Sequence, residues 1–263
     1  MEKIIGNVTG VNGNLVSVKV DGSIRKNEVA YVKVGDTKLK GEVIKLNNGI
    51  VSMQIYEMTE GIKVGDEVEF TSELMSVELG PGLLSMVYDG LQNPLDDLAA
   101  ECGFFLERGK YMNPIPDKDW EFTPKLSVGD PVHPGDALGS VPEGLFTHDI
   151  MVPFDLKGNW KIKSIVGKGV YNVRAKIAVI EDENGNEKEL TMVVSWPVKK
   201  AIKCYDERLA PNEPLITKIR CIDTFLPVAK GGTFCTPGPF GAGKTVLQHM
   251  QAKNSDVDVV IVA

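Results

Sequence analysis

The first 70 residues consist of short runs in which apolar and polar positions alternate. The alternation is clearest at 15–20 and 50–56, and it is the pattern of antiparallel strands with one buried face. Turn signals separate the runs at Asn12-Gly13, Asp21-Gly22, Gly35-Asp36, Asn48-Gly49 and Gly65-Asp66. This spacing predicts a small closed β-barrel over residues 1–70, with no chemistry of its own.

Residues 71–110 are expected to form a connector. Gly80-Pro81-Gly82 is typical of a turn. The residues after it predict a short helix that ends before Pro94, because proline interrupts a helix interior.

Residues 111–195 are again rich in strand patterns and predict a β insert. Asn184-Gly185, between apolar runs at 176–180 and 189–194, is the strongest hairpin signal in the chain. The insert resembles the barrel-sandwich fold of biotinyl and lipoyl carriers, which present a modifiable lysine at a hairpin tip. Because Asn184-Gly185 takes that tip here, we expect a structural insert, and a carrier function is the alternative.

Residues 196–263 predict the start of an α/β domain, entered through a linker near 195–215. A short strand is expected at 232–236, a helix at 246–253 and a buried strand at 257–263. The fold class is therefore multidomain β plus α/β, with an incomplete third domain.

One segment of this last domain fits the phosphate-loop pattern G-x-x-x-x-G-K-[ST] at every specified position: Gly238-Pro239-Phe240-Gly241-Ala242-Gly243-Lys244-Thr245. At an average glycine usage of about 7%, chance would produce such a match on the order of once in a hundred chains of this length. The expected strand, glycine loop and helix are the context that the motif requires.

The physical reason for the motif is the negative charge of a triphosphate. Glycines let successive backbone N–H groups face inward, and the positive end of the following helix adds to their field. Lys244 then places a full charge at the β- and γ-phosphates, and the Thr245 hydroxyl ligates Mg²⁺. The expected nucleotide-binding residues are Gly238, Pro239, Phe240, Gly241, Ala242, Gly243, Lys244, Thr245 and Val246, with Lys244 also catalytic and ATP or ADP with Mg²⁺ as ligands.

Composition removes several other classes of function. A formal net charge of -7 gives no basic field for nucleic acid or for an anionic membrane. Apolar runs are too short for a transmembrane helix, and no export signal is visible at the N-terminus. The spacing of the four cysteines matches neither a redox pair nor a zinc site, and no metal cluster is expected among the histidines.

The chain resembles the amino-terminal part of the catalytic A subunit of V-type and archaeal A-type rotary ATPases. The resemblance covers residues 1–263 and rests on ordered motifs: 76–82, Met151-Val152-Pro153, 189–192, Trp196-Pro197-Val198, 222–232 and the loop at 237–246. It implies a barrel, a protruding insert and a nucleotide-binding domain.

The resemblance also implies a function and partners. Members of the family couple ATP hydrolysis or synthesis to H⁺ or Na⁺ transport, in a ring with the B subunit and other subunits. This implies a cytoplasmic location, with only indirect attachment to the cytoplasmic face of the membrane. It implies no nucleic acid partner.

Two departures from the family pattern matter. Position 242 is alanine, where some eukaryotic members carry a redox-sensitive cysteine. The Gly-Glu-Arg stretch, whose glutamate orients the attacking water in the family, would follow Ala263. We therefore expect a fragment that is inactive alone, with a non-catalytic nucleotide- or subunit-binding fragment as the alternative. Its origin stays open between a split or intein-interrupted gene, a truncated gene, a frameshift and a deliberately expressed segment.

Overall fold

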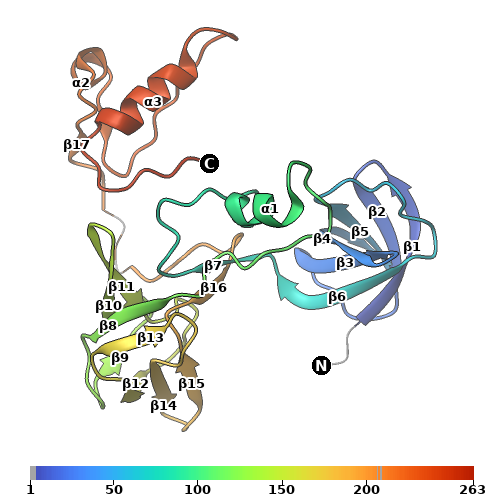
Figure 1. Ribbon diagram of the computed structural model, residues 1–263, viewed down its shortest axis with the longest axis horizontal. Coiled ribbons are helices and arrows are strands. Elements are labelled where there is room, and N and C mark those ends of the chain that lie inside the picture. The colour runs from blue at the N-terminus through green and yellow to red at the C-terminus, as the bar shows by residue number, and fades with distance from the viewer. Residues whose placement is uncertain (1–3, 206, 208) are drawn as a thin grey trace. The chain divides into compact units, whose positions relative to one another are not determined.

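The structure is a computed structural model that describes residues 4–205, 207 and 209–263. The chain divides into two compact units, Met1–Cys204 and Tyr205–Ala263. The first unit holds a β-barrel, a larger β insert and a short two-stranded stem (Figure 1). No helix in the described part of the chain is long and apolar enough to cross a bilayer.

The six strands at the start of the chain form a closed barrel, which confirms the barrel predicted from the alternating pattern. In β5, for example, Val51, Met53 and Ile55 are buried, whereas the residues between them are partly exposed. Closure leaves no unpaired strand edge. The strands are β1 (Ile4–Asn12), β2 (Leu15–Val20), β3 (Glu28–Val34), β4 (Thr37–Asn47), β5 (Ile50–Ile55) and β6 (Glu67–Leu74), paired in the order β1-β2-β5-β4-β3-β6.

A buried carboxylate on the barrel holds the segment that follows the stem. The stem consists of β7 (Ser76–Leu79) paired with β16 (Val194–Pro197). The Glu42 side chain of β4 is almost fully buried, and its two oxygens lie 2.6 and 2.7 Å from Lys199 Nζ. The Tyr56 hydroxyl donates to the same carboxylate at 2.8 Å, and burial followed by this hydrogen bond raises the pKa of Tyr56 above its ordinary value.

The connector contains a helix on the other side of Pro94 from the one predicted. Helix α1 (Leu95–Cys102) begins directly after Pro94, so the prediction of a helix ending before this proline is wrong. Proline is tolerated at a helix start because its missing N–H would have no intrahelical partner there. Asp96 and Asp97 lie in the first turn, where their negative charges interact favourably with the positive end of the helix dipole.

The insert is built from two four-stranded sheets that share one core, as the barrel-sandwich prediction requires. One sheet has the order β11-β10-β8-β13 and the other β15-β14-β12-β9. Phe122 and Leu138 of the first sheet pack in the same cluster as Ile162 and Ile180 of the second. The strands are β8 (Asp119–Pro124), β9 (Pro131–Val132), β10 (Ala137–Glu143), β11 (Phe146–Met151), β12 (Trp160–Ile165), β13 (Gly169–Asn172), β14 (Ala178–Asp182) and β15 (Glu187–Leu190).

The hairpin predicted at Asn184-Gly185 joins β14 to β15. Gly185 has a φ of 81°, which glycine adopts without a steric penalty. Asp182 Oδ1 accepts the backbone N–H groups of Asn184 and Asn186 at 2.9 and 2.8 Å. The turn at 183–186 contains no lysine, so this tip offers no attachment point for a carrier group.

The glycines of Gly80-Pro81-Gly82 allow the stem to dock closely against the insert. A Cβ on Gly80 would lie 2.8 Å from the Met192 carbonyl oxygen, closer than such atoms approach. Gly82 has a φ of 105° and donates its N–H to Glu143 Oε1 at 2.6 Å. The Glu143 side chain is buried, and its other oxygen lies 2.6 Å from His148 Nδ1.

The second unit is a partial α/β region. It contains β17 (Pro214–Leu215) paired with β18 (Val228–Ala229), and the helices α2 (Arg220–Phe225) and α3 (Lys244–Asn254). Its buried residues are few; in the described ranges they are Thr217, Ile222 and Val228.

The two strands predicted around the glycine loop are wrong. Residues 232–236 and 257–263 have no regular secondary structure, and Ile261 and Val262 are more than four-fifths exposed. A strand is stabilised by a neighbour that pairs with its N–H and C=O groups. In the described part of this unit the ladder joins β17 to β18, and no ladder reaches either segment.

Candidate phosphate-binding site

The glycine loop leads directly into the longest helix of the second unit. Gly243, with a φ of 82°, is the N-cap of α3, and Gly241 has a φ of 80°. A residue with a Cβ is disfavoured in this left-handed region, so the local backbone conformation explains why glycine occupies both positions. The predicted loop is therefore present, and so is the helix predicted after it, which spans Lys244–Asn254 and includes the run at 246–253.

Lys244 turns its ammonium group back over the loop. Its Nζ donates to the carbonyl oxygens of Gly238 and Pro239, at 2.6 and 2.7 Å. The loop has one further internal bond, from Ala242 N–H to the Pro239 carbonyl oxygen at 3.3 Å. The structure thus brings a positive charge, a glycine-rich turn and a helix N-terminus to one place.

No acidic residue lies in the first turn of α3, and Lys253 lies in its last turn. The positive end of the helix dipole therefore faces the loop without a carboxylate from its own first turn, while Lys253 complements the negative end. This charge arrangement suits an anion at the loop.

The remaining predicted site residues stand open to solvent. Pro239, Gly241, Ala242, Thr245 and Val246 are all exposed, and Gly238 and Gly243 are exposed as well. Phe240 is fully exposed at the tip of the loop, so it does not pack against the described part of the unit. His249 is exposed on α3.

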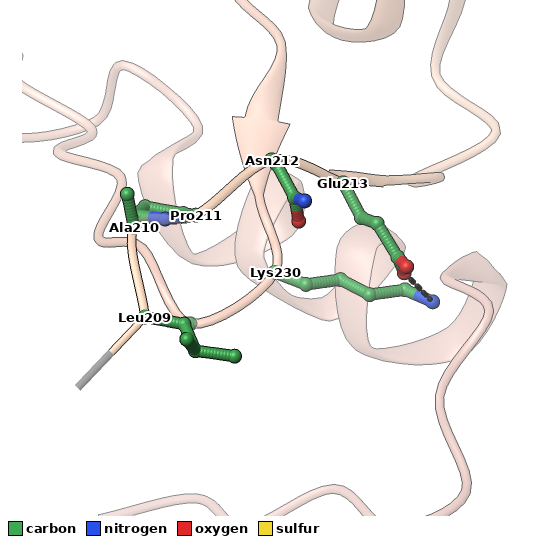
Figure 2. A pocket seen from close by; sticks show the side chains of 7 residues that line it. Leu209, Ala210, Pro211, Asn212, Glu213 and Lys230 are labelled. Carbon is green, nitrogen blue, oxygen red and sulfur yellow. Dashed lines mark hydrogen bonds and ion pairs between the residues drawn. The ribbon is translucent and has the colours of Figure 1, made fainter. Parts of the chain in front are cut away.

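A separate pocket of about 350 Å³ lies elsewhere in the same unit. It is lined by residues 209–213 together with Lys230 and Gly231. Figure 2 shows the Lys230 side chain extending toward the Glu213 carboxylate. Lys230 Nζ lies 3.4 Å from Glu213 Oε2, which partly neutralises both charges. None of its lining residues belongs to the glycine loop, and no nucleophile or metal-binding set gathers there.

One polar network in this unit has no signal in the sequence. Thr217 is buried, with an exposed fraction of 1%, and both its N–H and its hydroxyl donate to Asp223 Oδ1, at 3.0 and 2.6 Å. Asp223 Oδ2 accepts the Lys218 N–H at 3.0 Å. These hydrogen bonds, first that of the Thr217 hydroxyl, lower the pKa of Asp223 below its ordinary value. The spacing of Thr217 and Asp223 gave no signal, since only the folded turn brings them together.

Other candidate chemistry does not assemble in the described residues. They contain no group of three or more histidine, cysteine or acidic side chains that could hold a metal ion, and Cys102, Cys204, Cys221 and Cys235 are free thiols. Glu143 lies beside His148, and Asp136 lies 3.3 Å from His133.

Comparison with known proteins gives matches in every part of the chain. Residues 8–72 match the β-barrel domain of the ATP synthase alpha/beta family, and residues 114–199 match the barrel-sandwich domain of ATP synthase alpha/beta subunits. The V-type ATP synthase alpha chain of Treponema denticola is 57% identical over 264 residues, covering 100% of this chain and 45% of that protein.

Two further relatives give the same picture. The V-type ATP synthase alpha chain of Borreliella burgdorferi is 57% identical over 259 residues, covering 98% of this chain and 45% of that protein. That of Borrelia garinii subsp. bavariensis is 55% identical over 262 residues, covering 99% and 46%. The chain spans about half the length of the curated relatives that it matches. Over its whole length, therefore, it corresponds to the amino-terminal portion of a V-type ATP synthase alpha chain.

Proposed function

We propose that the glycine loop at residues 238–245 binds the phosphates of ATP or ADP with Mg²⁺. The observation that carries this proposal is the position of Lys244 at the first turn of α3, with its ammonium over a loop of exposed backbone. The helix N-terminus and the absence of an acidic side chain in the first turn support it.

Each residue of the loop has a chemical role in this proposal. Lys244 exchanges its two carbonyl partners for phosphate oxygens, which are stronger acceptors because they are charged. The N–H groups of Gly241 and Gly243 donate to the same phosphates. The exposed Thr245 hydroxyl would be a suitable ligand for the Mg²⁺ that accompanies the nucleotide, since this ion prefers oxygen donors. Gly238, Pro239, Phe240, Ala242 and Val246 complete the proposed nucleotide contact.

In the whole subunit we propose that this loop serves ATP hydrolysis or synthesis coupled to the movement of H⁺ or Na⁺. The similarity to V-type ATP synthase alpha chains supports this role. Assembly with a B subunit and other subunits on the cytoplasmic side of a membrane belongs to the same proposal.

For the 263-residue chain itself we propose binding without turnover. Hydrolysis needs an acidic group that orients the attacking water. Among the described residues no carboxylate contacts Lys244 or Thr245. The Asp223 carboxylate accepts hydrogen bonds from Thr217 and Lys218 instead. A fragment that binds nucleotide or partner subunits is therefore the second candidate function.

Calorimetric titration with MgATP tests both proposals on the purified chain. We expect the wild type to bind, Lys244→Ala to lose binding, and phosphate release to stay at background. Lys253→Ala is a matched control, because it removes a lysine from the far end of the same helix. Equal binding by the wild type and Lys244→Ala would contradict the phosphate-loop proposal. Phosphate release above background by the purified wild-type chain would contradict the proposal of binding without turnover.

A further inference from the structure

Helix α3 carries the loop residues Lys244 and Thr245, yet it buries none of its own side chains in the described structure. A phosphate site needs its donors held in place before the ligand arrives. Leu247, Gln251, Ala252 and Asn254 are only partly buried. Side-chain packing therefore holds this helix weakly, and hydrogen bonds outside the helix contribute to fixing its position.

One hydrogen bond attaches the far end of the helix to the rest of its unit. The Asp256 N–H, two residues beyond the last helical residue, donates to the Ile216 carbonyl oxygen at 3.0 Å. Within the described ranges, no other hydrogen bond joins residues 233–263 to the remainder of the second unit. The Ile216 carbonyl is thus the anchor point of α3.

The anchor point is itself held by Asp223. Residue 217, directly after Ile216, is buried and gives both of its donors to the Asp223 carboxylate. Lys218 has a φ of 60°, an unusual conformation for a residue with a side chain, and its N–H also donates to Asp223. Three donors on one carboxylate therefore fix the turn at 216–218.

We propose that Asp223 is a positioning residue for the phosphate loop: it holds the turn that anchors the residue after α3, and so orients the helix that begins at Lys244. This inference rests on the proposed function of the loop. A helix of 11 residues is a rod about 16 Å long, so a change at its anchored end is transmitted to its other end. The rival explanation is that Asp223 only stabilises the local turn before α2.

Asp256→Pro and Asp256→Ala form a matched pair that tests the anchor. Proline removes the N–H donor, whereas alanine keeps it and removes only the side chain. Ser255 has a ψ of 153°, the extended conformation that residues before proline prefer, so proline fits after the helix. We expect hydrogen exchange of the α3 amides to become about five-fold faster in Asp256→Pro, the effect of one lost hydrogen bond, and to be unchanged in Asp256→Ala.

Variants of Asp223 test the link to the loop. Asp223→Ala removes all three acceptor contacts, whereas Asp223→Asn keeps one oxygen for Thr217. Exchange in α3 should rise in Asp223→Ala and be largely restored in Asp223→Asn. The double variant Asp223→Ala with Asp256→Pro should exchange no faster than the faster single variant, because both changes remove the same attachment.

Titration with MgADP gives the functional readout on the same variants. We expect Asp223→Ala and Asp256→Pro each to weaken binding about three- to ten-fold, with Asp256→Ala equal to the wild type. Faster exchange confined to residues 216–223, with α3 and binding unchanged, would overturn the proposal. If the wild type binds no nucleotide, the proposed function fails; the exchange of α3 in Asp223→Ala then still decides whether Asp223 positions this helix.

Discussion

The ammonium group of Lys244 lies 2.6 Å from the carbonyl oxygen of Gly238, six residues earlier in the chain. With the contact to Pro239, it closes the loop around a positive charge. The loop is thereby shaped before any ligand arrives, and a phosphate group would replace two neutral acceptors with charged ones.

The left-handed conformation of Gly243 makes a first prediction. No atom lies within 4 Å of a Cβ added there, so the cost of a side chain comes from the backbone alone. Gly243→Val should weaken MgADP binding by about 1–2 kcal/mol, the cost of this conformation for a residue with a Cβ. Gly243→Asn should lose much less, because asparagine tolerates left-handed φ values. Equal losses in the two variants, measured by calorimetry, would show that conformation is not the cause.

The buried carboxylate of Glu42 makes a second prediction. Lys199→Ala leaves Glu42 with Tyr56 as its remaining side-chain partner, and it should lower the free energy of unfolding of the first unit by about 1–2 kcal/mol. This value is below that of a fully buried pair because the Lys199 side chain is 55% exposed. Urea unfolding followed by tryptophan fluorescence measures it, since Trp120, Trp160 and Trp196 all lie in this unit.

Lys203→Ala is the control for that measurement. Lys203 is exposed and forms no ion pair within the described structure. If Lys199→Ala unfolds at the same urea concentration as Lys203→Ala, the Glu42 contact does not stabilise the unit.

The hairpin residue Asp182 makes a prediction about pH. Hydrogen bonds from Asn186, first that of its side chain, hold the pKa of Asp182 below its ordinary value. Because the folded pKa is depressed, the stabilisation is present above the unfolded value of about 3.9 and is lost as the pH falls through the folded pKa. The melting temperature of the insert should therefore be flat from pH 7 to 5 and fall below about pH 4.

Asp182→Ala separates this residue from general acid unfolding. Trp160 on β12 is the register partner of Asp182, so its fluorescence reports on the hairpin. The variant should melt lower at pH 7 and lose less between pH 5 and pH 3 than the wild type. Glu183→Gln leaves the Asp182 contacts intact and keeps a side-chain oxygen for Asn159, so this variant should behave as the wild type. A variant that loses as much as the wild type on acidification would refute this assignment.

Local signals predicted the β modules well. The period-2 alternation in β5 and the Asn184-Gly185 turn depend on neighbours close in sequence, and both appear in the structure. Pro94 correctly indicated a helix boundary, but the helix begins after this residue instead of ending before it. Proline can both end and begin a helix, so the sequence did not distinguish the two.

Pairing between distant segments was less predictable. The run at 257–263 has the composition of a strand, but composition does not supply a neighbouring strand to pair with. Its residues are exposed and belong to no sheet of the described structure. The loop motif marked Lys244 and Thr245 correctly as residues at a helix start. The contacts of Asp223 with Thr217 and of Glu42 with Lys199 come from folded turns and strands, so no sequence spacing reveals them.

The most direct test of phosphate binding by the glycine loop is the change in backbone amide chemical shifts when MgADP is added to the 263-residue chain. We predict that the largest shifts occur at the amides of Gly241, Gly243, Lys244 and Thr245, and that Lys244→Ala abolishes them. The largest shifts at residues 209–213 around the separate pocket, or no shifts at all, would contradict it.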